Sequence, residues 1–160
     1  MKLLLSTLAA MALFAGVAHA DGLYVMGAGS LANFDDLHTD NLGYSGEAGW
    51  TNGTLAGGVE ISSHKHLGNE TLGAVLNGHV FTPTWHSLRL YGTVGIGSTF
   101  EGDPIGQAGG GVMWVANDGG DSGSFNIFAG YEHRCYPDSW DSFDCDSNDG
   151  YAKAGIMLTF

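Results

Sequence analysis

The chain has 160 residues, of which 44% are hydrophobic and 14% are charged, and its formal net charge is -12 at pH 7. This length corresponds to one domain. The apolar and aromatic content excludes a disordered acidic chain. Seventeen acidic against five basic residues exclude a nucleic-acid binder, which needs a positive surface to contact phosphates.

Residues 1–20 have the features of a cleaved secretory signal peptide. Lys2 supplies a positive charge, Leu3 to Val17 form an apolar segment, and Ala18-His19-Ala20 is a small-x-small cleavage site. The apolar segment is shorter than the ~20 residues that a membrane-spanning helix needs. We therefore expect export of the chain, with residues 21–160 as the mature domain.

The mature sequence alternates apolar and polar residues with a period of two, and Gly, Pro, Asn and Asp clusters interrupt the alternation. This pattern predicts eight strands at 22–30, 43–50, 54–63, 71–81, 86–99, 105–116, 124–134 and 150–160. The three prolines (Pro83, Pro104 and Pro137) fall between these ranges, as expected of a residue that cannot donate to a ladder. Short, turn-like connections alternate along the chain with a second kind of connection, and two connections of this second kind are long loops. Such alternation is typical of a bacterial up-and-down membrane barrel with its termini in the periplasm.

The two faces of the predicted strands differ in chemistry. In the last strand one face carries Ala152, Ala154, Ile156, Leu158 and Phe160, and the other carries Tyr151, Lys153, Gly155, Met157 and Thr159. An apolar face opposite a face of small and charged residues suits lipid outside and a narrow polar lumen inside. Aromatic residues fall near predicted strand ends, where membrane interfaces favour them. They are Trp50, Phe81, Trp85, Trp114, Phe125 and Phe160 at the periplasmic end, and Phe34, Tyr44, Phe100, Tyr131 and Tyr136 at the outer end.

The sequence resembles the small outer-membrane β-barrel proteins of Gram-negative bacteria, the OmpA/OmpX-like group of eight-stranded barrels. The resemblance rests on the signal peptide, on Gly22 to Gly29, on Leu90 to Gly97 and on the closing strand Tyr151 to Phe160. It implies an all-β, eight-stranded antiparallel up-and-down transmembrane barrel in the cell outer membrane. It also implies that a terminal signal, carried here by Ile156, Leu158 and Phe160, is recognised by the barrel-assembly machinery.

Six charged residues fall on predicted lumen faces: Glu47, Glu60, Arg89, Glu132, Arg134 and Lys153. An eight-stranded barrel has just enough interior for side chains, so these charges must pair or be hydrated. One hypothesis is a salt-bridged plug that holds the barrel shut, as in similar barrels. The alternative is a narrow ion channel that these salt bridges gate.

The last outer loop contains five aspartates and the pair Cys135 and Cys145, the only cysteines of the chain. We expect a Cys135–Cys145 disulfide, because exported compartments favour oxidation. The run from Asp144 to Gly150 resembles a calcium loop but lacks its terminal Glu, so a solvated acidic loop is the favoured interpretation. His64 and His66 are placed in a loop that has no Cys or carboxylate at the spacing of a metal site. No metal site and no cofactor are therefore predicted.

A lipid A-modifying enzyme is a further alternative, since outer-membrane deacylases are barrels of similar length with a His-x-Ser pair and a Glu. Here the matching segment is His133-Arg134-Cys135, and the final strand has no Glu, so the catalytic residues are missing. The sequence therefore favours a non-enzymatic, monomeric outer-membrane protein with acidic extracellular loops and a structural or surface-interaction role. Its expected partners are outer-membrane lipid, lipopolysaccharide and the assembly machinery, with no nucleic acid.

We predict that Phe160→Ser combined with Leu158→Asn abolishes membrane insertion, because the C-terminal apolar face both signals assembly and closes the barrel. The measurement is the yield of heat-modifiable protein in the outer-membrane fraction. A normal yield from the double variant would contradict the assembly role of these residues.

Overall fold

The computed structural model describes residues 22–32, 42–66, 69–117, 123–137 and 148–160. They form eight strands: β1 (Gly22–Ala32), β2 (Leu42–Thr51), β3 (Leu55–His66), β4 (Asn69–Phe81), β5 (Leu88–Thr99), β6 (Pro104–Asn117), β7 (Ser124–Cys135) and β8 (Asn148–Thr159). All eight predicted strands are confirmed. Within these residues there is no helix that is long and apolar enough to cross a membrane.

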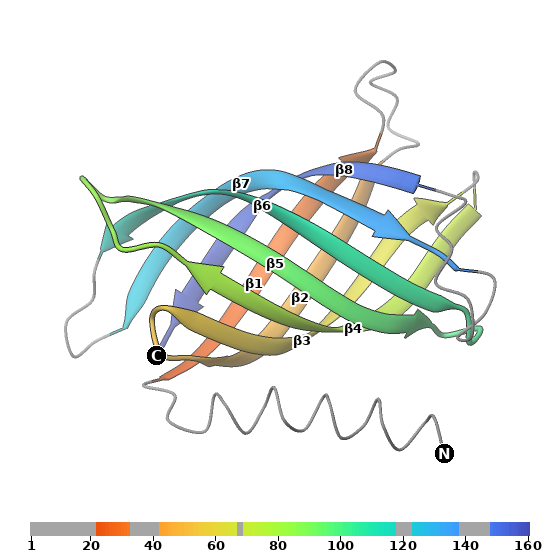
Figure 1. The fold of residues 1–160 in the computed structure, drawn as a ribbon, viewed down its shortest axis with the longest axis horizontal. Coiled ribbons are helices and arrows are strands. Elements are labelled where there is room, and N and C mark those ends of the chain that lie inside the picture. The colour runs from red at the N-terminus through yellow and green to blue at the C-terminus, as the bar shows by residue number, and fades with distance from the viewer. Residues whose placement is uncertain (1–21, 33–41, 67–68, 118–122, 138–147) are drawn as a thin grey trace.

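The strands form one closed antiparallel barrel, in which each strand pairs with the next along the chain (Figure 1). Closure comes from pairing of β8 with β1, where Leu158 lies opposite Val25 and Met157 opposite Met26. Because the sheet has no edge, every strand finds backbone partners on both sides, as a transmembrane sheet requires. The predicted all-β, eight-stranded antiparallel up-and-down barrel is confirmed.

The barrel has two distinct ends. β1 begins and β8 ends at the same end, which we call the N/C end, where β2, β4 and β6 end and β3, β5 and β7 begin. At the opposite end, called the loop end, β1, β3, β5 and β7 end and β2, β4, β6 and β8 begin. In Figure 1 the chain's C-terminus marks the N/C end.

Each strand differs from its predicted range by one to three residues at one or both ends, and three of these differences stand out. β5 begins at Leu88, because His86 and Ser87 have positive φ and form a two-residue turn closed by reciprocal backbone bonds between Trp85 and Leu88. Pro104 is the first residue of β6, a position where its missing N–H costs no ladder bond. The third difference is at the end of β3, which continues to His66 and so includes residues that were expected in a loop.

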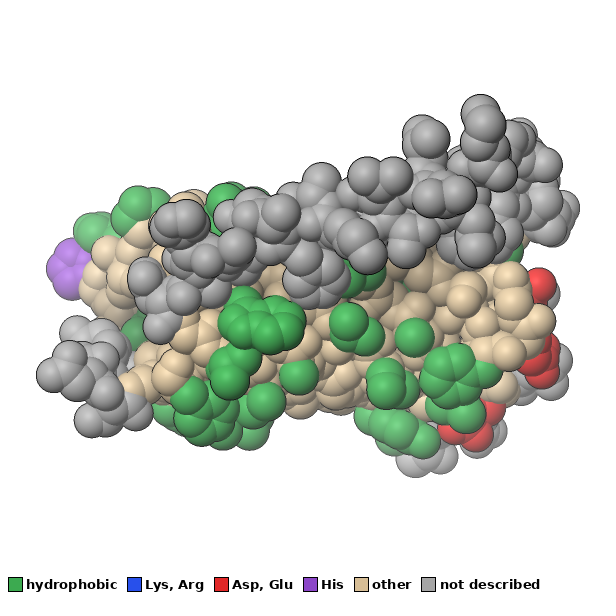
Figure 2. Space-filling view, turned by 90° about the horizontal axis from the view of Figure 1, so that it is seen from below, with side chains coloured by type: hydrophobic (Ala, Val, Ile, Leu, Met, Phe, Trp, Pro, Cys, Tyr) green, Lys and Arg blue, Asp and Glu red, His purple; other side chains and the backbone are tan. Residues whose placement is uncertain are grey.

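The outer face of the barrel is apolar along most of its height. Leu23, Val59, Val94, Val112, Ile127 and Ile156 are among its exposed side chains. Figure 2 shows hydrophobic side chains projecting from the wall and acidic side chains at the loop end. Exposed Trp50, Trp85 and Trp114 lie near the N/C end, as expected of an aromatic belt. Phe81 was predicted to belong to that belt, and this is wrong, because its side chain is buried in the lumen.

Glycines on the inner wall make room for large side chains. A Cβ at Gly130 would lie 2.4 Å from the hydroxyl of Tyr91 and 2.4 Å from the carbonyl oxygen of Gly110. Tyr91 on β5 therefore lies against bare backbone of the neighbouring strands β6 and β7, and its ring makes an edge-to-face contact with Phe128. The Gly-rich composition thus allows a narrow barrel to enclose aromatic residues.

Candidate functional site: the barrel lumen

Four charged side chains form one cluster inside the barrel, which we call the charge cluster: Glu60, Glu132, Arg134 and Lys153. Lys153 Nζ donates to Glu60 Oε2 at 2.6 Å and to Glu132 Oε2 at 3.1 Å. Arg134 Nε donates to Glu132 Oε1 at 2.8 Å, and Arg134 Nη2 donates to Glu60 Oε1. All four side chains are buried, and the formal charges of the two acids and two bases cancel.

The fold explains why these residues meet. Glu132 and Arg134 are two residues apart on β7, so both point inward. Lys153 lies on the adjacent β8, opposite Gly130. Glu60 comes from β3, across the barrel from β7, and Ser62 on the same strand accepts a hydrogen bond of 2.8 Å from Arg134 Nη1. The charge cluster therefore ties opposite walls together.

Glu47 is the centre of a second, separate group. Its Oε1 accepts a hydrogen bond from the hydroxyl of Tyr24 and lies 2.7 Å from His79 Nε2, while its Oε2 accepts from Asn77 Nδ2 at 2.8 Å. These groups come from β1, β2 and β4. Three polar contacts thus compensate the burial of Glu47, which has no Arg or Lys partner among the described residues.

Asn77 connects the two groups. Its Nδ2 also lies 3.5 Å from Glu60 Oε2, and its Oδ1 accepts a hydrogen bond of 2.6 Å from Gln107 Nε2. A Cβ at Gly95 would lie 2.1 Å from Asn77 Oδ1, so a glycine there leaves space for this amide. The polar part of the lumen is one continuous network rather than a set of isolated ion pairs.

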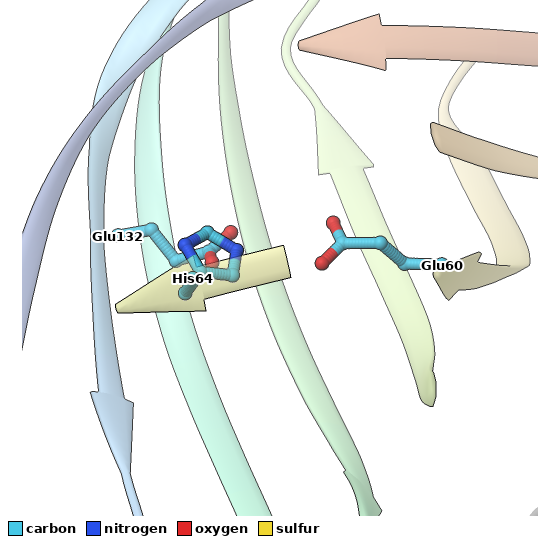
Figure 3. A group of neighbouring side chains, drawn as sticks. All are labelled: Glu60, His64 and Glu132. Carbon is cyan, nitrogen blue, oxygen red and sulfur yellow. The ribbon is translucent and has the colours of Figure 1, made fainter. Parts of the chain in front are cut away.

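His64 is buried at the loop end of the lumen, where Ser30 Oγ lies 3.2 Å from its Nδ1 and the Tyr151 ring contacts it edge-on. Potential ligand atoms of His64, Glu60 and Glu132 lie within 4.8 Å of one another, and Figure 3 shows these three side chains. Both carboxylates, however, already bind Lys153 and Arg134. A divalent ion would have to displace the Lys153 ammonium and would add positive charge beside the Arg134 guanidinium. The donor set therefore favours an ion-pair cluster over a metal centre.

Arg89 lies apart from the charge cluster, at the N/C end. Its guanidinium is 4.3 Å from the centre of the Phe81 ring, and its Nη1 donates to the carbonyl oxygen of Gly53 at 3.1 Å. Its Nε and Nη2 lie 3.3 and 3.2 Å from Met113 Sδ. Among the described residues, no carboxylate lies within ion-pair distance of Arg89.

Of the six lumen charges named from the sequence, the structure brings Glu60, Glu132, Arg134 and Lys153 together and places Glu47 and Arg89 elsewhere. Sequence reasoning missed the neutral partners, which are Tyr24, Ser62, His64, Asn77, His79 and Gln107. Their signal was available, because each occupies an inward position of the two-residue alternation. His64 was placed in a loop, and this is wrong, because it lies on β3 with its side chain buried.

Other residues named from the sequence lie partly outside the described residues. Cys145 is among them, so the Cys135–Cys145 disulfide stays a prediction, as does the nature of the acidic loop at 138–147. Ile156 and Phe160 project outward, Leu158 is half-buried, and their role in assembly stays a prediction.

The solved structures that are similar to this chain include the following three. One is a designed transmembrane β-barrel, with a TM-score of 0.61, 15% identity and coverage of 88% of this chain and 97% of that chain. The N-terminal β-barrel domain of OprF from Pseudomonas aeruginosa has a TM-score of 0.64, 12% identity and coverage of 88% and 98%. Neisserial surface protein A has a TM-score of 0.61, 14% identity and coverage of 86% and 97%.

No protein-family model matches the sequence, and no curated protein matches it. The structural similarity therefore concerns the fold. It confirms the predicted resemblance to the eight-stranded outer-membrane barrels and supports the transmembrane form of the barrel.

We predict that Arg134→Ala lowers the free energy of unfolding by about 3–5 kcal/mol, because it leaves two buried carboxylates with one cation. Arg89→Ala is the matched control and should cost about 1 kcal/mol, since it removes a contact with Phe81 at a half-buried site. The measurement is urea unfolding of both variants in lipid vesicles. Equal destabilisation by the two substitutions would contradict a stabilising role of the charge cluster.

Proposed function

We propose that this chain is a non-enzymatic integral protein of the outer membrane, with a closed lumen and a structural or surface-interaction role. The observation that carries the proposal is the charge cluster, in which every charged group is buried and paired, and Glu60 binds Arg134 and Lys153 across the lumen. Such an arrangement joins the walls of the barrel and leaves no unpaired charge within the charge cluster to bind a permeating ion. The functional surface is then the set of acidic loops at the loop end, which we place outside the cell.

The arrangement of β7 supports a non-enzymatic role. A catalytic triad needs its members within hydrogen-bond reach of one another. Glu132 and His133 are adjacent in sequence and therefore point to opposite faces, with Glu132 in the lumen and His133 exposed on the outer wall. Arg134 returns to the lumen, where Glu60, Ser62 and Glu132 occupy its donors.

The location and orientation are tested by epitope tags in two loops. A tag within 138–147 should be accessible to antibody on intact cells, because this loop is at the proposed extracellular end. A matched tag within 118–122, at the N/C end, should be detected only after the outer membrane is permeabilised. The reverse pattern, or no signal from either tag on cells that retain the protein, would contradict the proposed topology.

The closed lumen is tested separately. The purified protein, refolded and inserted into planar bilayers, should give no steady single-channel current in monovalent salt. Reproducible channel openings of the wild-type protein would overturn the closed-lumen proposal and favour the alternative of a narrow channel gated by the lumen ion pairs.

A further inference from the structure

The N/C end of the lumen is filled by a layer of buried side chains that the charge cluster does not enter. We call this layer the apolar seal, and its members are Tyr24, Ala56, Phe81, Met113, Phe128 and Met157. None of them is more than 4% exposed, and they come from six different strands. Met113 and Phe128 lie directly opposite each other on β6 and β7. The seal therefore reaches around most of the barrel circumference at one level.

The apolar seal and the charge cluster are separate layers. On β7, Phe128 precedes Glu132 by four residues, and on β8, Met157 follows Lys153 by four residues. With ~3.3 Å per residue and a strand tilt of about 40°, the two layers are on the order of 10 Å apart along the barrel axis. A small cavity between them is lined by members of both layers and has room for roughly one water molecule.

Arg89 covers the seal from the N/C end. Its guanidinium lies over the Phe81 ring and donates to Met113 Sδ and to the carbonyl oxygen of Gly53 in the β2–β3 turn. These contacts connect two members of the seal to a turn at the barrel mouth. Arg89 thus covers Phe81 and Met113 on the side of the barrel mouth.

An ion that crosses a dry apolar layer loses its hydration and finds no charge in exchange, whereas a polar cluster offers it replacement ligands. We propose that the apolar seal alone is sufficient to prevent ion passage, an inference that rests on the closed lumen proposed above. The charge cluster then stabilises the barrel by joining its walls and is not required for closure. The proposal therefore differs from the channel hypothesis, in which the ion pairs themselves are the gate.

The test compares two variants by single-channel recording and by ion flux from lipid vesicles. In the first, the charge cluster is neutralised with side chains of similar size: Glu60→Gln, Glu132→Gln, Arg134→Met and Lys153→Met. In the second, Phe81→Ala, Met113→Ala and Phe128→Ala are added. We expect the first variant to be as silent as the wild-type protein and the second to conduct, with ion flux at least tenfold above the vesicle background.

Steady current through the first variant, with a silent wild type, would overturn this inference and leave the proposed function intact. Silence of both variants would overturn it as well, because closure would then lie outside the apolar seal. Current through the wild-type protein would instead contradict the proposed function. The outcomes thus separate the two proposals.

Heat-modifiable migration shows that each variant has folded before it is recorded. Val94→Ala with Val112→Ala, on the lipid-facing wall, is the matched control for loss of side-chain volume and should remain silent. If the fourfold neutralised variant does not fold, the double substitution Glu60→Gln with Arg134→Met takes the place of the four substitutions in both variants. The outcomes given above then test the inference in the same way.

Discussion

Closure of eight strands into one ring is the constraint on which the rest of this structure depends. It removes both sheet edges, and it also produces an interior so narrow that inward side chains must satisfy one another. Lys153 and Arg134 each bind both Glu60 and Glu132, so two cations are shared between two carboxylates. Buried charges persist in this interior because each has a partner of opposite charge, and Glu60 supplies a partner from the opposite wall. The same closure brings together residues that are far apart in sequence.

The inner and outer faces of the wall follow opposite rules. Outward positions are apolar and exposed, which is unfavourable in water but suits a lipid environment. Inward positions change along the axis, from the apolar seal at the N/C end, through the group around Glu47, to the charge cluster and His64 toward the loop end. The lumen is therefore a layered core, in which polar layers fix the pairing of strands and an apolar layer excludes water.

The sequence predicted all eight strands, because a two-residue period and turn residues are local signals. Phe81 was misplaced because an aromatic residue near a strand end suits either face. Only its spacing of two and four residues from His79 and Asn77 on the same strand places it on the inward face. His64 was missed because a polar strand end resembles a loop. The four members of the charge cluster were identified because the two-residue alternation places each on an inward face. Arg89 is on an inward face too, and only the register of the strands shows that it lies at another level of the lumen.

The central claim is that mutual pairing across the lumen stabilises the barrel, and a double-mutant cycle between Glu60 and Arg134 tests it most directly. The free energies of unfolding in urea are measured for the wild type, Glu60→Gln, Arg134→Met and the double variant. The account predicts a coupling energy of about 2–3 kcal/mol, because each single substitution leaves buried charge unpaired and the double substitution does not. Additive effects, within about 0.5 kcal/mol, would contradict it.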